Sequence, residues 1–215
     1  MTAHTESWYA DLLDTVATSH RAVEVTLARL TDDEARGPSL LPGWSRGHVV
    51  THMARNADAL NRFAMGAITG VPAAEMYPGG PVARASAIEE GADRPAELLA
   101  ADFRFAGRRV LDSLGRIPAD RFLEPVNWRK AVTAHFIPVL RWRELEIHHA
   151  DLGLGYTPAD WPENFVEGTL ESELPALREH HPDVRVPDLP HAELLAWLIG
   201  RPMRDGLPAV PAWPF

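Results

Sequence analysis

The residues best suited to chemistry lie in the stretch 141–152, whose sequence is RWRELEIHHADL. Good helix formers dominate it and neither Gly nor Pro interrupts it, so the stretch is predicted to be helical. Residues four apart on a helix share one face, with Cβ atoms about 5–6 Å apart. Glu144 and His148 have this spacing. A carboxylate and an imidazole at that separation can bind one small cation together.

A zinc site needs more than these two groups, because Zn²⁺ normally takes three or four ligands. The natural third ligand is His52, which lies far away in the sequence on another predicted helix. It lies at the margin of an apolar stripe, where a ligand that projects into a helical bundle would be found. Other interpretations stay open on the residues alone. Glu144 and His148 could form a solvated surface pair, and His52 could be a core-edge histidine bonded to a carbonyl.

Ionisable groups are unusually dense around the Glu144–His148 pair. Six of them alternate with apolar residues on this helix: Arg143, Glu144, Glu146, His148, His149 and Asp151. A helix that must pack and still carries so many charges departs from the usual pattern, and such departures tend to mark sites. Each helical residue turns the side chain by about 100°, so His149 is predicted to point away from the face of Glu144 and His148.

Apolar periodicity predicts the helices that would hold these groups. Ser45 is a good N-cap, and Gly153 and Gly155 are expected to end the helix that carries the pair. Thr31 and Glu34 have the spacing of a capping box at the start of another helix. The four long helices are expected at residues 4–30, 45–66, 95–114 and 133–154, with a shorter one at 81–90 and an irregular segment at 117–130. They predict a four-helix core.

The composition changes after Gly155. Residues 156–190 are rich in proline, and helical periodicity remains only around 164–174, followed by a helix at 191–200. Residues 184–186 could form a short strand. We therefore expect two parts: a metal-binding four-helix bundle over 1–155 and a small α/β part over 156–215. The fold class is mainly α.

Composition and charge limit the classes of function. The chain is 46% hydrophobic and 24% charged, which is ordinary for a soluble globular protein. A net charge of −9 argues against nucleic acid or an anionic membrane as the main partner. No apolar run could span a bilayer, no signal-peptide pattern is present and cysteine is absent, so a cytoplasmic location is expected. Any thiol chemistry needs a thiol from outside the protein.

Three segments carry a resemblance to a known family: LPGWSRGHVVTHMARNA at 41–57, TGVPAAEMY at 69–77 and RELEIHHADLG at 143–153. They resemble the mycothiol-dependent maleylpyruvate isomerases of the DinB-like superfamily. Such a resemblance implies a DinB-like four-helix bundle. It also implies a divalent metal, usually zinc, bound by the equivalents of His52, Glu144 and His148.

The resemblance also extends to the C-terminal helix. Family members end this helix in Gly-Arg, and the arginine is thought to act at the active site, which implies Arg201 here. Two departures are evident. The family prototype has several strands before that helix, so the C-terminal part of this chain is expected to be shortened. Glu146 and His149 add polar groups where apolar or small residues are common in the family.

The activity implied is a cis-trans isomerisation of maleylpyruvate to fumarylpyruvate, a step of the gentisate route of aromatic catabolism. The partners would be a small-molecule substrate and mycothiol or another low-molecular-weight thiol. A DinB-like S-transferase that joins such a thiol to an electrophile is one alternative, and the shortened C-terminal part favours it. The other alternative is a non-catalytic metal-binding module. The oligomeric state is left open, and a monomer is compatible with the sequence.

Overall fold

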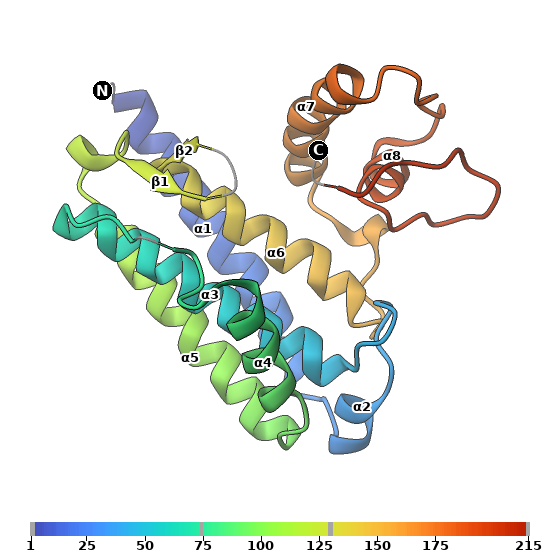
Figure 1. Ribbon diagram of the computed structural model, residues 1–215, viewed down its shortest axis with the longest axis horizontal. Helices are drawn as coiled ribbons and strands as arrows, with labels where there is room; N and C mark the ends of the chain where they lie inside the picture. Colours follow the sequence, from blue (N-terminus) through green and yellow to red (C-terminus); the bar gives the residue numbers. More distant parts are fainter. Residues whose placement is uncertain (1–2, 74, 129–130, 214–215) are drawn as a thin grey trace. The chain divides into compact units, whose positions relative to one another are not determined.

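The fold comes from a computed structural model of the chain, which describes residues 3–73, 75–128 and 131–213 (Figure 1). The chain divides into two compact units, Met1–Leu154 and Gly155–Phe215, and each is described by itself. Among the described residues, no helix combines the length and the apolar character needed to cross a membrane.

Four long helices form the first unit: α1 (Ala3–Leu27), α3 (Arg46–Thr69), α5 (Ala96–Gly115) and α6 (Ile137–Asp151). Helix α1 packs against α5 and α6, and α3 packs against the same two helices, so each helix has two neighbours in a closed bundle (Figure 1). Two shorter helices, α2 (Asp32–Arg36) and α4 (Gly80–Ala92), pack against α3. The predicted four-helix core and the mainly helical fold class are confirmed.

Local signals in the sequence set several helix ends. Thr31 and Glu34 form the predicted capping box of α2. Ser45 caps α3: its hydroxyl accepts the backbone N–H of His48. Helix α6 begins at Ile137 rather than at 133, because residues 134–136 form a 3₁₀ turn before it. Pro138 lies in the first turn of α6, where its missing N–H breaks no helical hydrogen bond.

One cluster of the core joins α3, α5 and α6. Its fully buried members include Leu60, Val110, Leu114 and Ile137. Burying a side chain of this size stabilises the fold by roughly 1.5–3 kcal/mol. This packing holds α3 and α6 in a fixed relation, which a site shared by the two helices requires.

One short strand lies in the segment expected to be irregular, 117–130, and a second strand follows that segment. Strands β1 (Pro125–Asn127) and β2 (Ala131–Thr133) pair antiparallel, with Val126 opposite Val132. A 3₁₀ turn, η1 (Ala119–Arg121), precedes them. Strands of three residues are too short for an alternating pattern to be recognised in the sequence.

The second unit contains η3 (Pro158–Asp160), α7 (Glu163–His180) and α8 (His191–Leu198). The strand predicted at 184–186 is wrong: residues 181–190 contain neither helix nor strand. Three prolines in this segment (Pro182, Pro187 and Pro190) cannot donate to a strand ladder, and the described part of the unit offers no strand to pair with. The α/β character expected for this part is therefore corrected to helix plus extended chain.

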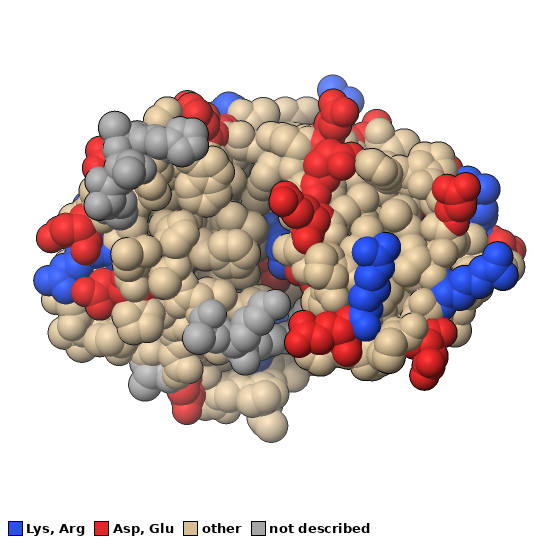
Figure 2. Space-filling model, turned by 90° about the horizontal axis from the view of Figure 1, so that it is seen from above, with Lys and Arg blue, Asp and Glu red and all other residues tan. Residues whose placement is uncertain are grey.

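Charges of both signs lie on the face that Figure 2 draws. On the face drawn in Figure 2, acidic and basic side chains lie interspersed rather than gathered by sign. This face therefore has no broad positive area that could attract an anionic ligand. The net charge of −9 for the whole chain points the same way. An anionic substrate would need local positive groups within its binding site.

Candidate metal centre

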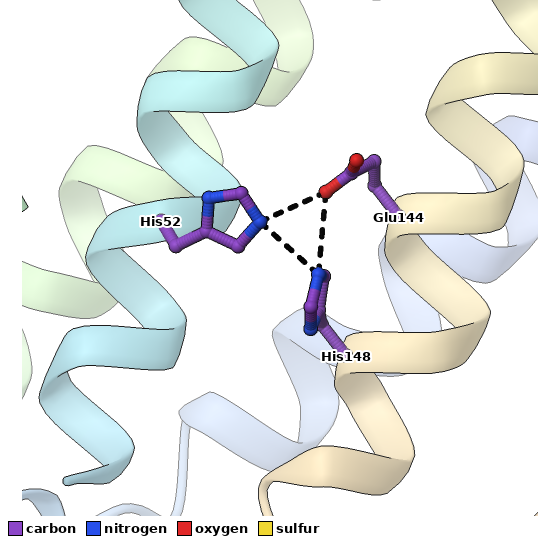
Figure 3. Close-up of side chains that lie close together, drawn as sticks. All are labelled: His52, Glu144 and His148. Atoms are coloured by element: carbon purple, nitrogen blue, oxygen red, sulfur yellow. Dashed lines mark hydrogen bonds and ion pairs between the residues drawn. The ribbon is translucent and has the colours of Figure 1, made fainter. Parts of the chain in front are cut away.

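The three residues predicted as metal ligands come together between α3 and α6 (Figure 3). His52 Nε2 lies 3.1 Å from His148 Nε2 and 3.0 Å from Glu144 Oε2. Glu144 Oε2 and His148 Nε2 are 3.4 Å apart. The three atoms all lie within 4.8 Å of one another, so one ion could contact all of them.

The chemistry of these atoms fits a metal. Glu144 Oε2 is buried and makes no hydrogen bond of acceptable geometry, although two imidazoles lie close to it. A buried carboxylate oxygen without a donor is costly, and a cation would satisfy it. Two imidazole nitrogens and one carboxylate oxygen are a common protein ligand set for zinc, and three protein ligands leave a fourth position open.

The bundle explains why these side chains meet. His52 is buried on α3, beside the fully buried Val49 and Met53. Glu144 and His148 lie one helical turn apart on the side of α6 that faces His52 (Figure 3). The i, i+4 spacing brings together the two groups on α6, and only the packing of α3 against α6 adds the third.

Asp151 supports the centre from behind His148. Its Oδ2 lies 2.8 Å from His148 Nδ1, and the side chain is 1% exposed. Metal-bound histidines usually donate their second ring N–H to such a carboxylate, which fixes the ring and raises its basicity. In the sequence, Asp151 stands out only as a member of the charged cluster. Its i, i+3 spacing from His148 was the signal that could have assigned it.

The ionisation of the centre follows from its burial and its neighbours. Burial lowers the pKa of His148, but the hydrogen bond to Asp151 and the nearby Glu144 carboxylate outweigh this effect and raise it to about 9. Burial would raise the pKa of Glu144, yet the nearby imidazoles of His52 and His148 hold it well below its ordinary value. The pKa of His52 is lowered, chiefly by burial, although Glu144 opposes the shift. The carboxylate is therefore ionised, and a metal would displace the proton that His148 holds at neutral pH.

Arg141 is a buried cation one turn before Glu144. Its Nη1 donates to the Met53 carbonyl at 2.8 Å and to Asn56 Oδ1 at 3.1 Å, which ties α6 to α3. Burial lowers the pKa of Arg141 to about 10, while the charge of Glu144 works against this shift. The guanidinium therefore keeps its positive charge at neutral pH and favours the ionised form of Glu144.

Glu146 and His149 face a different helix. Glu146 accepts hydrogen bonds from Ser19 of α1 and from Trp142 Nε1 at 3.1 Å. His149 Nε2 lies 2.7 Å from Thr26 Oγ1, also on α1. The polar groups that depart from the family pattern thus join α6 to α1, away from the metal cluster.

Replacing His149 by alanine is therefore expected to leave the metal in place. The loss includes the hydrogen bond to Thr26 of α1, worth about 0.5–1.5 kcal/mol of stability. Metal content measured by elemental analysis and a thermal melt would check both parts. A His149→Ala protein without metal, beside a His148→Ala protein that keeps it, would shift the site by one residue.

Arg201 lies in the second unit, just after α8. Its backbone N–H donates to the Ala196 carbonyl at 2.7 Å, and its Nη1 donates to the Ile199 carbonyl at 2.8 Å. Gly200 before it has a φ of 76°, a left-handed value that suits glycine at a helix end. An active-site role for Arg201 stays a prediction.

The comparisons with known proteins agree with this picture. Residues 16–153 match the family described as mycothiol maleylpyruvate isomerase N-terminal domain. A crystal structure of the mycothiol-dependent maleylpyruvate isomerase is similar over 99% of this chain and 100% of that chain, with a TM-score of 0.85 and 25% identity. A structure of a histidine-to-alanine mutant of that isomerase has the same fold, with a TM-score of 0.84 and 24% identity over the same shares. A comparison with curated proteins finds no match.

These matches correct one expectation and confirm another. The C-terminal part is not shortened relative to the solved isomerase, because the similarity spans that chain completely. The family recognised from the motifs around His52 and Glu144 is confirmed, since the matched residues include both and form well over half of the chain. The chain belongs to the mycothiol maleylpyruvate isomerase N-terminal domain family.

Proposed function

We propose that this protein is a metal- and thiol-dependent isomerase that converts maleylpyruvate to fumarylpyruvate. The observation that carries the proposal is the convergence of His52, Glu144 and His148 on one point inside the bundle. Membership of the family and the similarity to a solved maleylpyruvate isomerase support it.

Zinc fits the ligand set, and when bound it would favour the thiolate form of a small thiol at its open position. His52, Glu144 and His148 would hold the ion, and Asp151 would fix the ring of His148. Arg141 would keep Glu144 ionised. The protein has no cysteine, so the thiol is mycothiol or another low-molecular-weight thiol from outside.

The substrate chemistry explains why a thiol is needed. Rotation about the cis double bond of maleylpyruvate requires that the bond first lose its double character. Addition of a sulfur nucleophile to one alkene carbon moves the electron pair to the conjugated carbonyl oxygen and gives an enolate. Rotation and expulsion of the sulfur then restore the double bond as trans, with no net change in atoms. Positive groups that bind the carboxylates and the enolate would lower the barrier.

The family resemblance makes Arg201 the predicted group for one substrate carboxylate. An arginine makes a planar two-point contact that lysine cannot make. Arg201→Lys is therefore expected to keep the metal and the melting temperature but to lose at least ~1.4 kcal/mol of transition-state stabilisation, about tenfold in kcat/KM. Wild-type turnover in this variant would mean that Arg201 binds no substrate carboxylate and only ends the helix α8.

Turnover of maleylpyruvate by the zinc-loaded protein, measured with a panel of thiols that includes mycothiol, tests the proposed function. Isomerisation that needs both metal and thiol is the expected result. Covalent thiol adducts with other electrophiles, found by mass spectrometry without isomerisation, would favour the S-transferase. The shortened C-terminal part was the argument for that alternative, and it no longer holds. Metal binding without either reaction would favour the binding module.

A further inference from the structure

Arg84 is a half-buried cation in direct contact with the metal cluster. It lies on α4, and its Nη2 is 3.0 Å from Nδ1 of His52. Its guanidinium also lies over the Tyr77 ring, 5.5 Å from the centroid. No carboxylate among the described residues lies within ion-pair distance of Arg84, so its charge is not neutralised by a neighbouring side chain.

Other arginines of the same unit are committed to partners. Arg55 and Arg94 both pair with Asp102, and Arg109 pairs with Asp58. Arg141 uses Nη1 to join α6 to α3. Arg84 differs from these because its hydrogen bond is to an imidazole nitrogen of a metal-ligand residue.

That hydrogen bond conflicts with a metal on the same ring. A guanidinium has only donors, so Nδ1 of His52 must be the acceptor, and the ring hydrogen must then be on Nε2. A metal at Nε2 takes the lone pair of that nitrogen and, in a neutral ring, places the hydrogen on Nδ1. Two N–H groups would then face each other across 3.0 Å. Metal binding should therefore release Arg84 from His52.

We propose that Arg84, once released, binds a carboxylate of the substrate beside the metal. The position suits this role, because one imidazole ring separates its contact on His52 from the nitrogen that faces Glu144 and His148. A free guanidinium presents two parallel donors to a carboxylate. The proposal rests on the proposed function and names Arg84 as a residue that determines specificity for an anionic substrate.

The neighbours of Arg84 suit an anion. Burial and the charge of Glu144 raise the pKa of Tyr77, although Arg84 and Asn56 at its hydroxyl act in the opposite direction. The phenol is thus neutral and can donate a hydrogen bond. An anion beside Arg84 would meet a guanidinium and a hydroxyl. The charge of Glu144 also reaches this place, and a metal bound to Glu144 would offset it.

Arg84→Gln tests the proposal through binding as well as catalysis. The probe is succinylpyruvate, the saturated analogue of maleylpyruvate, which has no double bond to isomerise. Calorimetry on zinc-loaded protein should show its affinity reduced at least about tenfold, as expected for loss of a charge-assisted hydrogen bond. In turnover, KM for maleylpyruvate should rise by a similar factor, while KM for the thiol should change less than about twofold. Arg84→Lys, which keeps the charge, should recover part of the affinity.

Zinc affinity separates this role from a structural one. If Arg84 only positions His52, Arg84→Gln should bind zinc more weakly than wild type. The proposal expects equal or tighter zinc binding, because the metal no longer has to displace a hydrogen bond. Arg116→Gln is the matched control, because it removes one positive charge from an exposed arginine that pairs with Asp112. It should change neither the affinity for zinc nor the affinity for succinylpyruvate.

The outcomes separate this proposal from the proposed function. Wild-type affinity of Arg84→Gln for succinylpyruvate, weaker zinc binding in that variant, or no binding of the probe by the wild type would overturn the role of Arg84. Absence of maleylpyruvate turnover in the wild type, together with Arg84-dependent binding of the probe, would overturn the isomerase assignment and support Arg84 as a carboxylate-binding residue.

Discussion

His52→Ala is expected to empty the metal centre and abolish activity while the bundle stays folded. The variant removes one of three converging ligands and leaves a pair, Glu144 and His148, on a single helix. Loss of an outer partner of a metal ligand typically costs ~10–100-fold in affinity, and loss of a ligand itself should cost more. Elemental analysis should find about one zinc per wild-type chain and almost none in the variant.

His148→Ala should lose the metal too, but it is the less clean variant. It removes the imidazole from Asp151, whose side chain is 1% exposed, and removing one partner of a buried charge is destabilising. We therefore expect its melting temperature to fall more than that of His52→Ala. Far-ultraviolet circular dichroism would show whether the helices remain. Equal metal content in wild type and both variants would exclude the site.

The second large effect is expected in acid and comes from His20 of α1. The ring is 3% exposed and stacks on Phe103, with ring centroids 4.5 Å apart. A side-chain carbon added at Gly107 would lie 1.6 Å from its Nε2, so α5 packs closely against the ring. Burial, followed by the charge of Arg141, lowers the pKa of His20 from 6.5 to about 3.

The sign of this pH effect on stability follows from proton binding at His20 in the unfolded and in the folded chain. The unfolded chain binds a proton at His20 below pH about 6.5, and the folded chain resists it until about 3. The neutral His20 ring therefore makes its full contribution to the free energy of unfolding above pH 6.5. This contribution is lost as the pH falls from 6.5 to about 3. The full loss is roughly 5 kcal/mol, and about 3 kcal/mol should be gone at pH 4.5.

Urea unfolding of the wild type and of His20→Gln at pH 7.5 and 4.5 would measure this loss. The variant is expected to be less stable at pH 7.5, because glutamine cannot stack on Phe103, but to lose less stability on acidification. His180→Gln, an exposed histidine of α7, is the control and should follow the wild type. Parallel pH dependence of wild type and His20→Gln would contradict the assignment.

The sequence by itself determined the features that depend on neighbours along the chain. Ser45 and Thr31 mark helix starts because their hydroxyls reach backbone N–H groups two or three residues on. The spacing of Glu144 and His148 places them on one face of α6 because the helical repeat is fixed. The same helical repeat predicted that His149 points away from the face of Glu144 and His148, and its contact with Thr26 of α1 confirms this. The motifs that contain these residues also identified the family.

Only the tertiary structure decided which groups meet across helices. His52 could have been a core-edge histidine until the packing of α3 on α6 placed its Nε2 3.0 Å from Glu144. The partners of Glu146 and His149 on α1 and the contact of Arg84 of α4 with His52 have no local pattern, because they depend on which faces the folded bundle brings together. The strand expected at 184–186 failed for the same reason, since a strand forms only where another strand supplies its hydrogen bonds.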